Sequence, residues 1–152
     1  MKLLPAHTAD PHTIAASREL TVVTGEGEIR GDAAAALLLA DWAVILPGST
    51  LLIDSAEAWA GAVWRLGRGA YALALAQRTR LSAAEAVEAG LCDSLDAFQL
   101  GSRSAIALDA GANLIRSRGG DALERAEFAR LFAAGIPQHG LAAFLRKQKP
   151  QF

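Results

Sequence analysis

A glycine-containing loop between a short apolar strand and a helix start is the stretch of this chain whose residue types could do chemistry. It reads LTVVTGEGEIRGDAAAALLLAD, from Leu20 to Asp41. Valines suit a pleated strand, and glycines permit unusual backbone angles. Gly31 and Asp32 stand where the helix should begin, and the unpaired amides of a helix start favour a phosphate, a carboxylate or an enolate oxyanion. We therefore predict an anion site at this helix start, with the Asp32 carboxylate as the N-cap of the helix.

The glycine spacing argues against a nucleotide as that anion. Gly25, Gly27 and Gly31 give G-x-G-x-x-x-G, which is one residue longer than the dinucleotide-binding fingerprint. The loop does not end in a lysine followed by serine or threonine, and no acidic residue closes a following strand about 20 residues on. We expect no nucleotide cofactor.

The remaining reactive side chains are scattered. His7 and His12 have no third ligand nearby in the sequence, so we expect no metal. Cys92 is better explained as a buried apolar residue than as a nucleophile. His139 is better explained as an exposed histidine in a turn. No G-x-S-x-G motif supports a hydrolase triad. A local basic cluster could meet phosphates, although solvated helix arginines explain it more simply; its members are Arg65, Arg68, Arg78 and Arg80.

Composition narrows the class of protein. The chain has 152 residues, 52% of them hydrophobic, and a formal net charge of -1, which argues against a nucleic-acid partner. Its single cysteine excludes an internal disulfide framework and suits the cytoplasm. The longest apolar run, Ala33 to Ala40, is far too short to span a membrane. We expect a cytoplasmic protein with no membrane segment.

The hydrophobic pattern predicts strands early in the chain and helices late. The segment from Met1 to Ser17 shows no hydrophobic periodicity, so we expect it to be an irregular arm. Ala33 to Leu39 should be a buried helix, because strong helix formers leave it no polar face. Ser82 and Glu85 form a capping box, S-x-x-E. Other predicted elements are strands over Trp42–Leu46 and Thr50–Ile53, helix from Ala56 onward, and helices over Ser102–Arg118, Asp121–Ala134 and Pro137–Lys147.

Two segments resemble the crotonase (enoyl-CoA hydratase/isomerase) family. The stretch YALALAQRTRLSAAEAVEAGLCDSL, from Tyr71 to Leu95, is similar to the family pattern "tGr.lsAeeAl..GLVd.v". Matching residues are Thr79, Arg80, Leu81, Ser82, Ala83, Glu85, Ala86, Gly90, Leu91 and Asp93. The C-terminus, with GLAAFL from Gly140 and the final Pro150-Gln151-Phe152, resembles the family ending "eG..AFlekr.P.F". Counted back from these anchors, the resemblance covers about residues 20 to 152.

The resemblance implies a fold and a division of the chain. We expect an α/β fold, a reduced crotonase-like (ClpP/crotonase) ββα spiral followed by an α-helical C-terminal region. Residues 1–101 would form the core with its N-terminal arm, and residues 102–152 the helical region. Family members place a first half before the Leu20 strand, with part of the CoA site and one oxyanion amide. We therefore expect a truncated member that lacks that half.

The resemblance also implies site residues. The family's helix-borne glutamate falls on Ala35, and its second oxyanion amide falls at Gly31 and Asp32. The second carboxylate falls near Ser55, which makes Glu57 the candidate general acid or base. A first-turn carboxylate favoured by the helix dipole is the simpler explanation of Glu57.

Two functions stay open at this point. In the first, the chain acts on or binds acyl-CoA thioesters through an oxyanion hole, as an enoyl-CoA hydratase/isomerase-type lyase or isomerase of fatty acid metabolism, impaired by Ala35. Coenzyme A would then be part of the substrate and not a cofactor. In the second, the chain is a non-catalytic subunit that assembles with itself or with a full-length crotonase. Its apolar composition predicts a homo-oligomer, and the resemblance to the family implies a trimer, or a dimer if the missing half has removed the trimer contacts.

Overall fold

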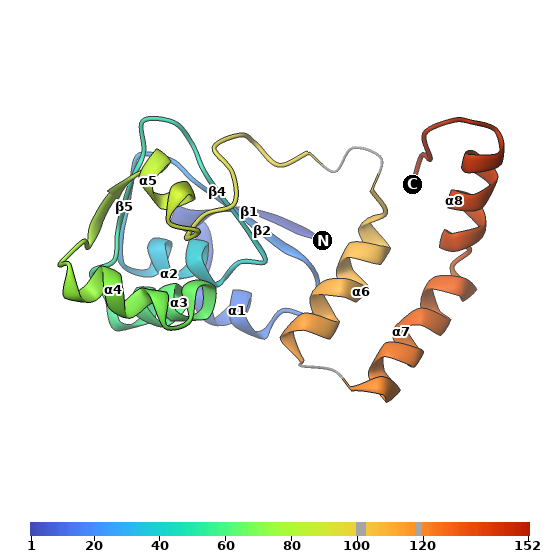
Figure 1. Ribbon diagram of the computed structural model, residues 1–152, viewed down its shortest axis with the longest axis horizontal. Helices are drawn as coiled ribbons and strands as arrows, with labels where there is room; N and C mark the ends of the chain where they lie inside the picture. The colour runs from blue at the N-terminus through green and yellow to red at the C-terminus, as the bar shows by residue number, and fades with distance from the viewer. Residues whose placement is uncertain (100–102, 118–119) are drawn as a thin grey trace. The chain divides into compact units, whose positions relative to one another are not determined.

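The chain forms two compact units. The structure, a computed structural model, describes residues 1–99, 103–117 and 120–152 (Figure 1). An α/β unit contains Lys2–Ser17 and Thr21–Phe98, and a helical unit contains Gln99–Phe152 together with Arg18–Leu20 and Met1. The domain boundary that the sequence predicts, between residues 101 and 102, falls outside the described residues.

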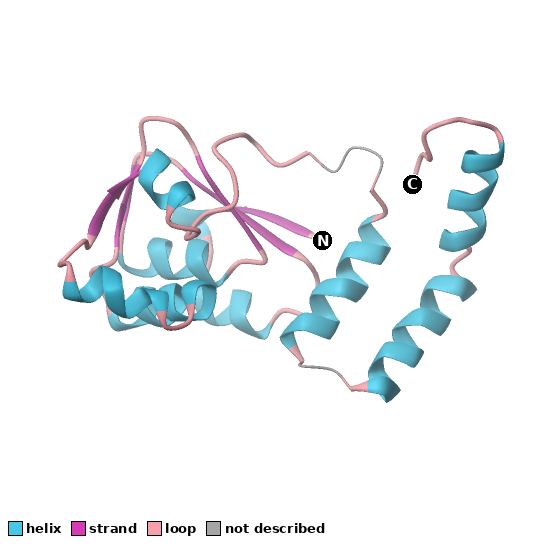
Figure 2. Ribbon diagram, in the orientation of Figure 1, coloured by secondary structure: helices cyan, strands magenta, loops and turns pink. Residues whose placement is uncertain are grey.

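The strands of the α/β unit form two small sheets (Figure 2). One sheet has the order β1-β2-β4 and is parallel throughout, and the other has the order β3-β5-β6, with β3 and β5 parallel and β6 antiparallel to β5. Strands β4 and β5, which follow each other along the chain, therefore belong to different sheets. The strand bounds are Lys2–Pro5 (β1), Thr21–Gly25 (β2), Glu28–Ile29 (β3), Trp42–Ile45 (β4), Thr50–Leu52 (β5) and Arg80–Ser82 (β6).

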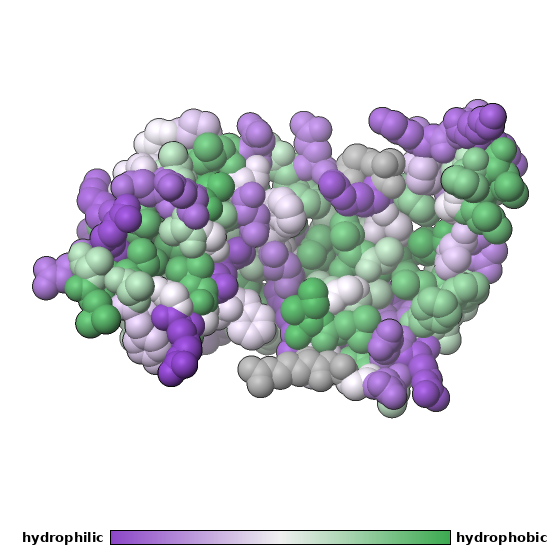
Figure 3. Space-filling model, viewed as in Figure 1, coloured by the Kyte–Doolittle hydropathy of each residue, from purple (hydrophilic) through white to green (hydrophobic). Residues whose placement is uncertain are grey.

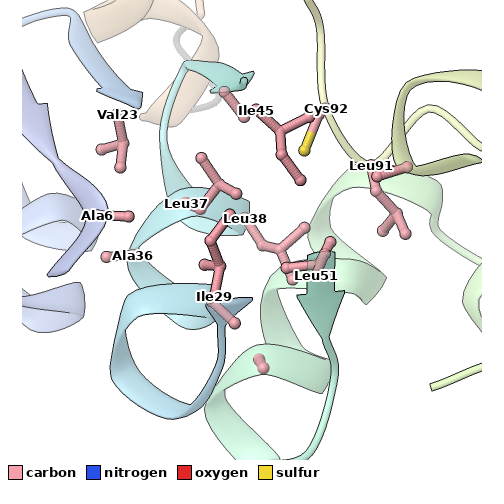
Figure 4. Packing of buried hydrophobic residues seen from close by; sticks show 14 of the residues in the cluster. Ala6, Val23, Ile29, Ala36, Leu37, Leu38, Ile45, Leu51, Leu91 and Cys92 are labelled. Atoms are coloured by element: carbon pink, nitrogen blue, oxygen red, sulfur yellow. The ribbon is translucent and has the colours of Figure 1, made fainter. Parts of the chain in front are cut away.

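Helix α2 (Gly31–Leu39) occupies the centre of the α/β unit, as the sequence predicts for a helix without a polar face. It packs against β2 and β4 and against α3 (Ala56–Leu66). Leu37 and Leu38 are fully buried and point into the core with Val23 and Ile45 (Figure 4). The α2–α3 approach is close enough to require a glycine, since a Cβ at Gly61 would lie 2.6 Å from the Leu38 Cβ.

The remaining α/β helices follow local sequence signals. Helix α4 (Gly69–Leu75) comes after α3, which ends at Gly67 with φ of 54°. The predicted capping box is confirmed at α5 (Ala83–Glu88): the Ser82 hydroxyl accepts the Glu85 amide at 3.3 Å, and the Glu85 carboxylate accepts the Ser82 amide at 2.8 Å. These contacts satisfy amides that a helix start otherwise leaves unpaired.

The prediction of an irregular arm before Ser17 was wrong. Strand β1 pairs along its length with β2, a short 3-10 helix η1 (Ala6–Thr8) follows, and α1 (Pro11–Ala16) comes next. Four residues are too few to show a period, so only pairing with β2 reveals the strand. The Asp10-Pro11 pair did carry a signal, because an aspartate N-cap followed by proline is typical of a helix start.

Three helices form most of the helical unit: α6 (Ala105–Arg116), α7 (Asp121–Ala133) and α8 (Ile136–Leu145). Helices α6 and α7 run antiparallel, and α7 contacts α8 (Figure 1). None of the described residues of α7 and α8 is buried. The predicted α/β architecture with a helical C-terminal region is confirmed. Along the described part of the chain, every helix falls short of the length and hydrophobicity needed to cross a membrane.

Candidate functional site

The start of α2 is built from two parallel strands that end at the same edge of a sheet. Strand β3 leads through Arg30 to Gly31, the first residue of α2, and its parallel neighbour β5 leads through Ile53 to Asp54. The Gly31 amide donates a hydrogen bond to the Asp54 Oδ1 at 2.9 Å. Gly31 has φ of 53°, a left-handed conformation that favours glycine. An internal carboxylate thus satisfies the first amide of the helix.

Arg30 holds the same carboxylate from its other side. Its Nε and Nη2 atoms lie 3.1 and 3.0 Å from the Asp54 Oδ2. The hydrogen bond from the Gly31 amide lowers the pKa of Asp54, and the Arg30 guanidinium lowers it further. Both donors favour the charged form, so Asp54 is an acceptor and not a proton donor near neutral pH.

The structure corrects the role of Asp32 as an N-cap. Asp32 is the second residue of α2, its side chain is exposed, and Arg30 is the N-cap residue. The carboxylate at this helix start comes instead from Asp54, which accepts the amide of Gly31, the first helical residue. In the described part of the chain, nothing accepts a hydrogen bond from the Asp32 amide. Of the two amides in the predicted anion site, Gly31 is therefore occupied and Asp32 is open.

Glu57 and Ala35 occupy very different surroundings. Glu57 lies exposed in the first turn of α3, whose start is capped by the Ser55 hydroxyl, 3.1 Å from the Ala58 amide. No hydrogen bond or ion pair joins the Glu57 side chain to another described residue. Ala35, where the resemblance places a glutamate, is fully buried inside α2. The predicted acid or base, Glu57, is thus an exposed carboxylate, and the position where the resemblance places a glutamate carries only a methyl group.

The predicted basic cluster is divided by the fold. Arg65 is only partly exposed, with 9% of its side chain accessible: it donates to the Leu38 and Ala40 carbonyls at the end of α2 and to the Asp93 carboxylate. Arg78 and Arg80 are exposed and pair with Glu85 at 2.8 Å and Glu28 at 3.4 Å. Arg68 precedes α4 and is also exposed. Three of the four arginines are therefore exposed to solvent, where a ligand could reach them, and two of these three are paired with a glutamate.

Cys92 and His139 are the two remaining candidate residues. Burial raises the pKa of the Cys92 thiol to about 12, which disfavours the thiolate that a nucleophile requires. The His139 ring lies 5.4 Å from the Phe152 ring in the helical unit. Within the residues that the structure describes, no three His, Cys, Asp or Glu side chains gather as a metal site would require.

Sequence reasoning missed Asp54, although the chain carried a signal for it. Asp54 lies two residues after the end of strand β5 and two residues before the start of α3. Polar residues at the carboxyl ends of neighbouring parallel strands meet at one edge of the sheet. The parallel pairing of β3 with β5 had to be known first, and the two strands are separated by the whole of α2 and β4.

Comparison with known proteins identifies the fold of this chain through solved structures. No family model and no curated protein matches the chain. Among solved structures, an enoyl-CoA hydratase/isomerase from Cupriavidus metallidurans CH34 superposes with a TM-score of 0.73 at 21% identity, over 92% of this chain and 63% of that one. An enoyl-CoA hydratase from Bacillus anthracis gives 0.70 at 18% identity, over 93% and 65%. An enoyl-CoA hydratase/isomerase from Marinobacter aquaeolei gives 0.64 at 20% identity, over 92% and 63%.

These similarities place the chain in the crotonase fold that the sequence motifs indicate. The matched region includes most of the chain, and the chain spans 63–65% of the length of these three structures. At 18–21% identity the similarity establishes the fold and leaves the activity open.

Proposed function

We propose that the chain is a crotonase-type protein that binds acyl-CoA thioesters and carries out hydratase or isomerase chemistry weakly or not at all. The observation that carries this proposal is the start of α2, where an open Asp32 amide stands beside a Gly31 amide already bonded to Asp54. Helix amides at such a position can polarise a thioester carbonyl. Coenzyme A enters as part of the substrate, and the exposed arginines of the α/β unit are its candidate phosphate contacts.

The weakness of the chemistry follows from the proton-transfer groups. At the position in α2 where the resemblance places a glutamate, this chain has Ala35. The neighbouring residues of α2 are also fully buried alanines and leucines. Glu57 is the remaining candidate acid or base, and it lies exposed to water without a partner among the described residues. A general acid or base contributes roughly 10²–10⁴-fold to a rate, so losing one of two carboxylates should lower turnover by that order.

Isothermal titration with free CoA and with a short-chain enoyl-CoA, followed by a hydration assay, tests the proposal. We expect the thioester to bind and its hydration to run roughly 10²–10⁴-fold below that of a hydratase with both carboxylates. Full hydratase turnover would show that the chemistry is intact. If neither compound binds, the chain is not a thioester-binding protein, and the second candidate function remains.

The second candidate is a subunit whose role is assembly, and the helical unit favours it. None of the described residues of α7 and α8 is buried, and large apolar side chains project from both helices. Part of this surface is green over α8 in Figure 3. The exposed residues are Phe128, Phe132, Leu141, Phe144 and Leu145. A partner would be a second copy of the chain, forming the predicted trimer or dimer, or a full-length crotonase.

We also propose a cytoplasmic location. Cys92 is free and buried, as suits a reducing compartment where disulfides do not persist.

A further inference from the structure

The helix pair α7–α8 carries opposite charges at its two ends. Figure 1 places the start of α7 and the end of α8 at opposite ends of this pair. The first turn of α7 holds the exposed carboxylates of Asp121 and Glu124, which we call the acidic end. The stretch from Gly135 to Phe152 contains no acidic residue. Three exposed basic residues follow the last turn of α8 and form the basic end: Arg146, Lys147 and Lys149.

Large apolar side chains lie between the two ends. Phe128 and Phe132 are 61% and 44% exposed on α7, and their ring centroids lie 4.7 Å apart. They continue the side of α7 on which the acidic end lies, because steps of three or four residues return to the same side of a helix. Three more exposed apolar side chains lie on α8: Leu141, Phe144 and Leu145. Exposed apolar side chains gathered in this way and bounded by charges are typical of a protein–protein contact.

The acidic end also contains a hollow. Its volume is about 350 Å³, and α7 lines it with Asp121, Glu124, Arg125 and Phe128. Two carboxylates and one guanidinium leave the hollow with a net negative charge, and the Phe128 ring makes part of its wall apolar. Such a hollow suits a long basic side chain, whose aliphatic stem packs on the ring while its charged head meets a carboxylate. The basic end carries three side chains of this kind.

We propose that this surface pairs with the same surface of a second copy across a two-fold axis, with each acidic end against the basic end of the other copy. In a two-fold interface the same patch serves on both subunits, so the patch must be complementary to itself. A patch with opposite charges at its ends meets that condition when the second copy is reversed, whereas a parallel arrangement places like charges together. The inference rests on the second candidate function, which it narrows to a dimer of this chain.

A charge exchange between two variants tests the pairing. Asp121→Lys with Glu124→Lys makes both ends basic, and Arg146→Glu with Lys147→Glu makes both ends acidic. We expect each variant alone to dimerise with a dissociation constant at least about tenfold higher than that of the wild type, because like charges meet at both ends of the interface. An equimolar mixture should recover the dimer, because an acidic end then meets a basic end at both contacts. Sedimentation equilibrium at micromolar concentration measures the masses.

The control is Glu88→Lys, which reverses an exposed charge on α5 of the α/β unit and should leave the wild-type mass unchanged. Circular dichroism checks that the variants keep their helices, and Asp121→Asn with Glu124→Gln replaces the lysine variant if that one unfolds. A wild-type trimer overturns the inference and leaves the assembly role standing. Variants that dimerise as the wild type does, or a mixture that stays monomeric, place the interface elsewhere and also overturn it. A monomeric wild type overturns it and leaves a full-length crotonase as the partner.

Discussion

The α/β unit and the helical unit bury their apolar residues to very different degrees. The large core cluster, centred on α2 with Leu37 and Leu38, lies in the α/β unit. In the helical unit α6 contributes two buried alanines, while the described residues of α7 and α8 are all at least partly exposed. Burial of apolar area is the main favourable contribution to folding. The α/β unit therefore carries its own stability, and the helical unit has apolar surface left for a partner.

The sharpest test of this difference is the assembly state of a double variant, Phe144→Asp with Leu145→Asp. These side chains are 76% and 72% exposed on α8. Charges forced into an apolar contact cost several kcal/mol, so an oligomer joined through α8 should fall to a monomer. Sedimentation equilibrium at micromolar concentration measures the mass.

Leu75→Asp is the control for that experiment, because Leu75 is 86% exposed but lies on α4 of the α/β unit. It should leave the mass unchanged. If the wild type is a monomer, the predicted oligomer is wrong. If Leu75→Asp dissociates the oligomer instead, the interface belongs to the α/β unit.

Replacing Arg65 should produce the largest loss of stability within the α/β unit. Its guanidinium donates to the Leu38 and Ala40 carbonyls at 3.0 and 2.8 Å and to the Asp93 Oδ2 at 3.0 Å. Arg65→Ala leaves these acceptors without their donor, and Leu38 and Ala40 are buried, so each unsatisfied carbonyl should cost about 1–3 kcal/mol. Urea denaturation measures the change in the free energy of unfolding. Arg78→Ala, at an exposed ion pair, should have little effect, and equal losses in the two variants would contradict the interpretation.

A pair of glycine substitutions compares the packing of the two units directly. A Cβ at Gly61 would lie 2.6 Å from the Leu38 Cβ, whereas a Cβ at Gly111 in α6 would meet no atom within 4 Å. Gly61→Ala should therefore destabilise by about 1–3 kcal/mol through overpacking. Gly111→Ala should stabilise by up to about 1 kcal/mol, because alanine is the better helix former. Thermal unfolding should show the opposite signs, and a stable Gly61→Ala variant would mean that α2 and α3 are less closely packed than described.

The smallest expected effect concerns the capping box of α5. Ser82→Ala removes the hydroxyl that accepts the Glu85 amide, which should cost about 1 kcal/mol of stability. Ser82→Thr keeps a hydroxyl and should recover most of that loss. Chemical denaturation of the three proteins measures the series, and a threonine variant as unstable as the alanine variant would show that the hydroxyl is not what stabilises α5.

Local signals in the sequence were sufficient for the elements whose causes are local. The capping box at Ser82 and Glu85, the burial of the Ala34–Leu38 stretch and the order of the helices from α2 onward could all be predicted, because each depends on residues a few positions apart. The family motifs also indicated the crotonase fold, with which the solved structures agree. The helix bounds differed from those expected by a few residues, as helix ends commonly do.

Tertiary structure alone decided which groups meet at the start of α2. The sequence by itself determined that a helix begins near Gly31, because glycine and a run of helix formers mark the place. It could not determine that Asp54 would satisfy the Gly31 amide, because that contact depends on the parallel pairing of β3 with β5 across intervening elements. The same reason hid β1, whose four residues become a strand only beside β2. Hydrogen bonds between distant segments are set by how the sheets pair, and neither residue types nor local spacing contain that information.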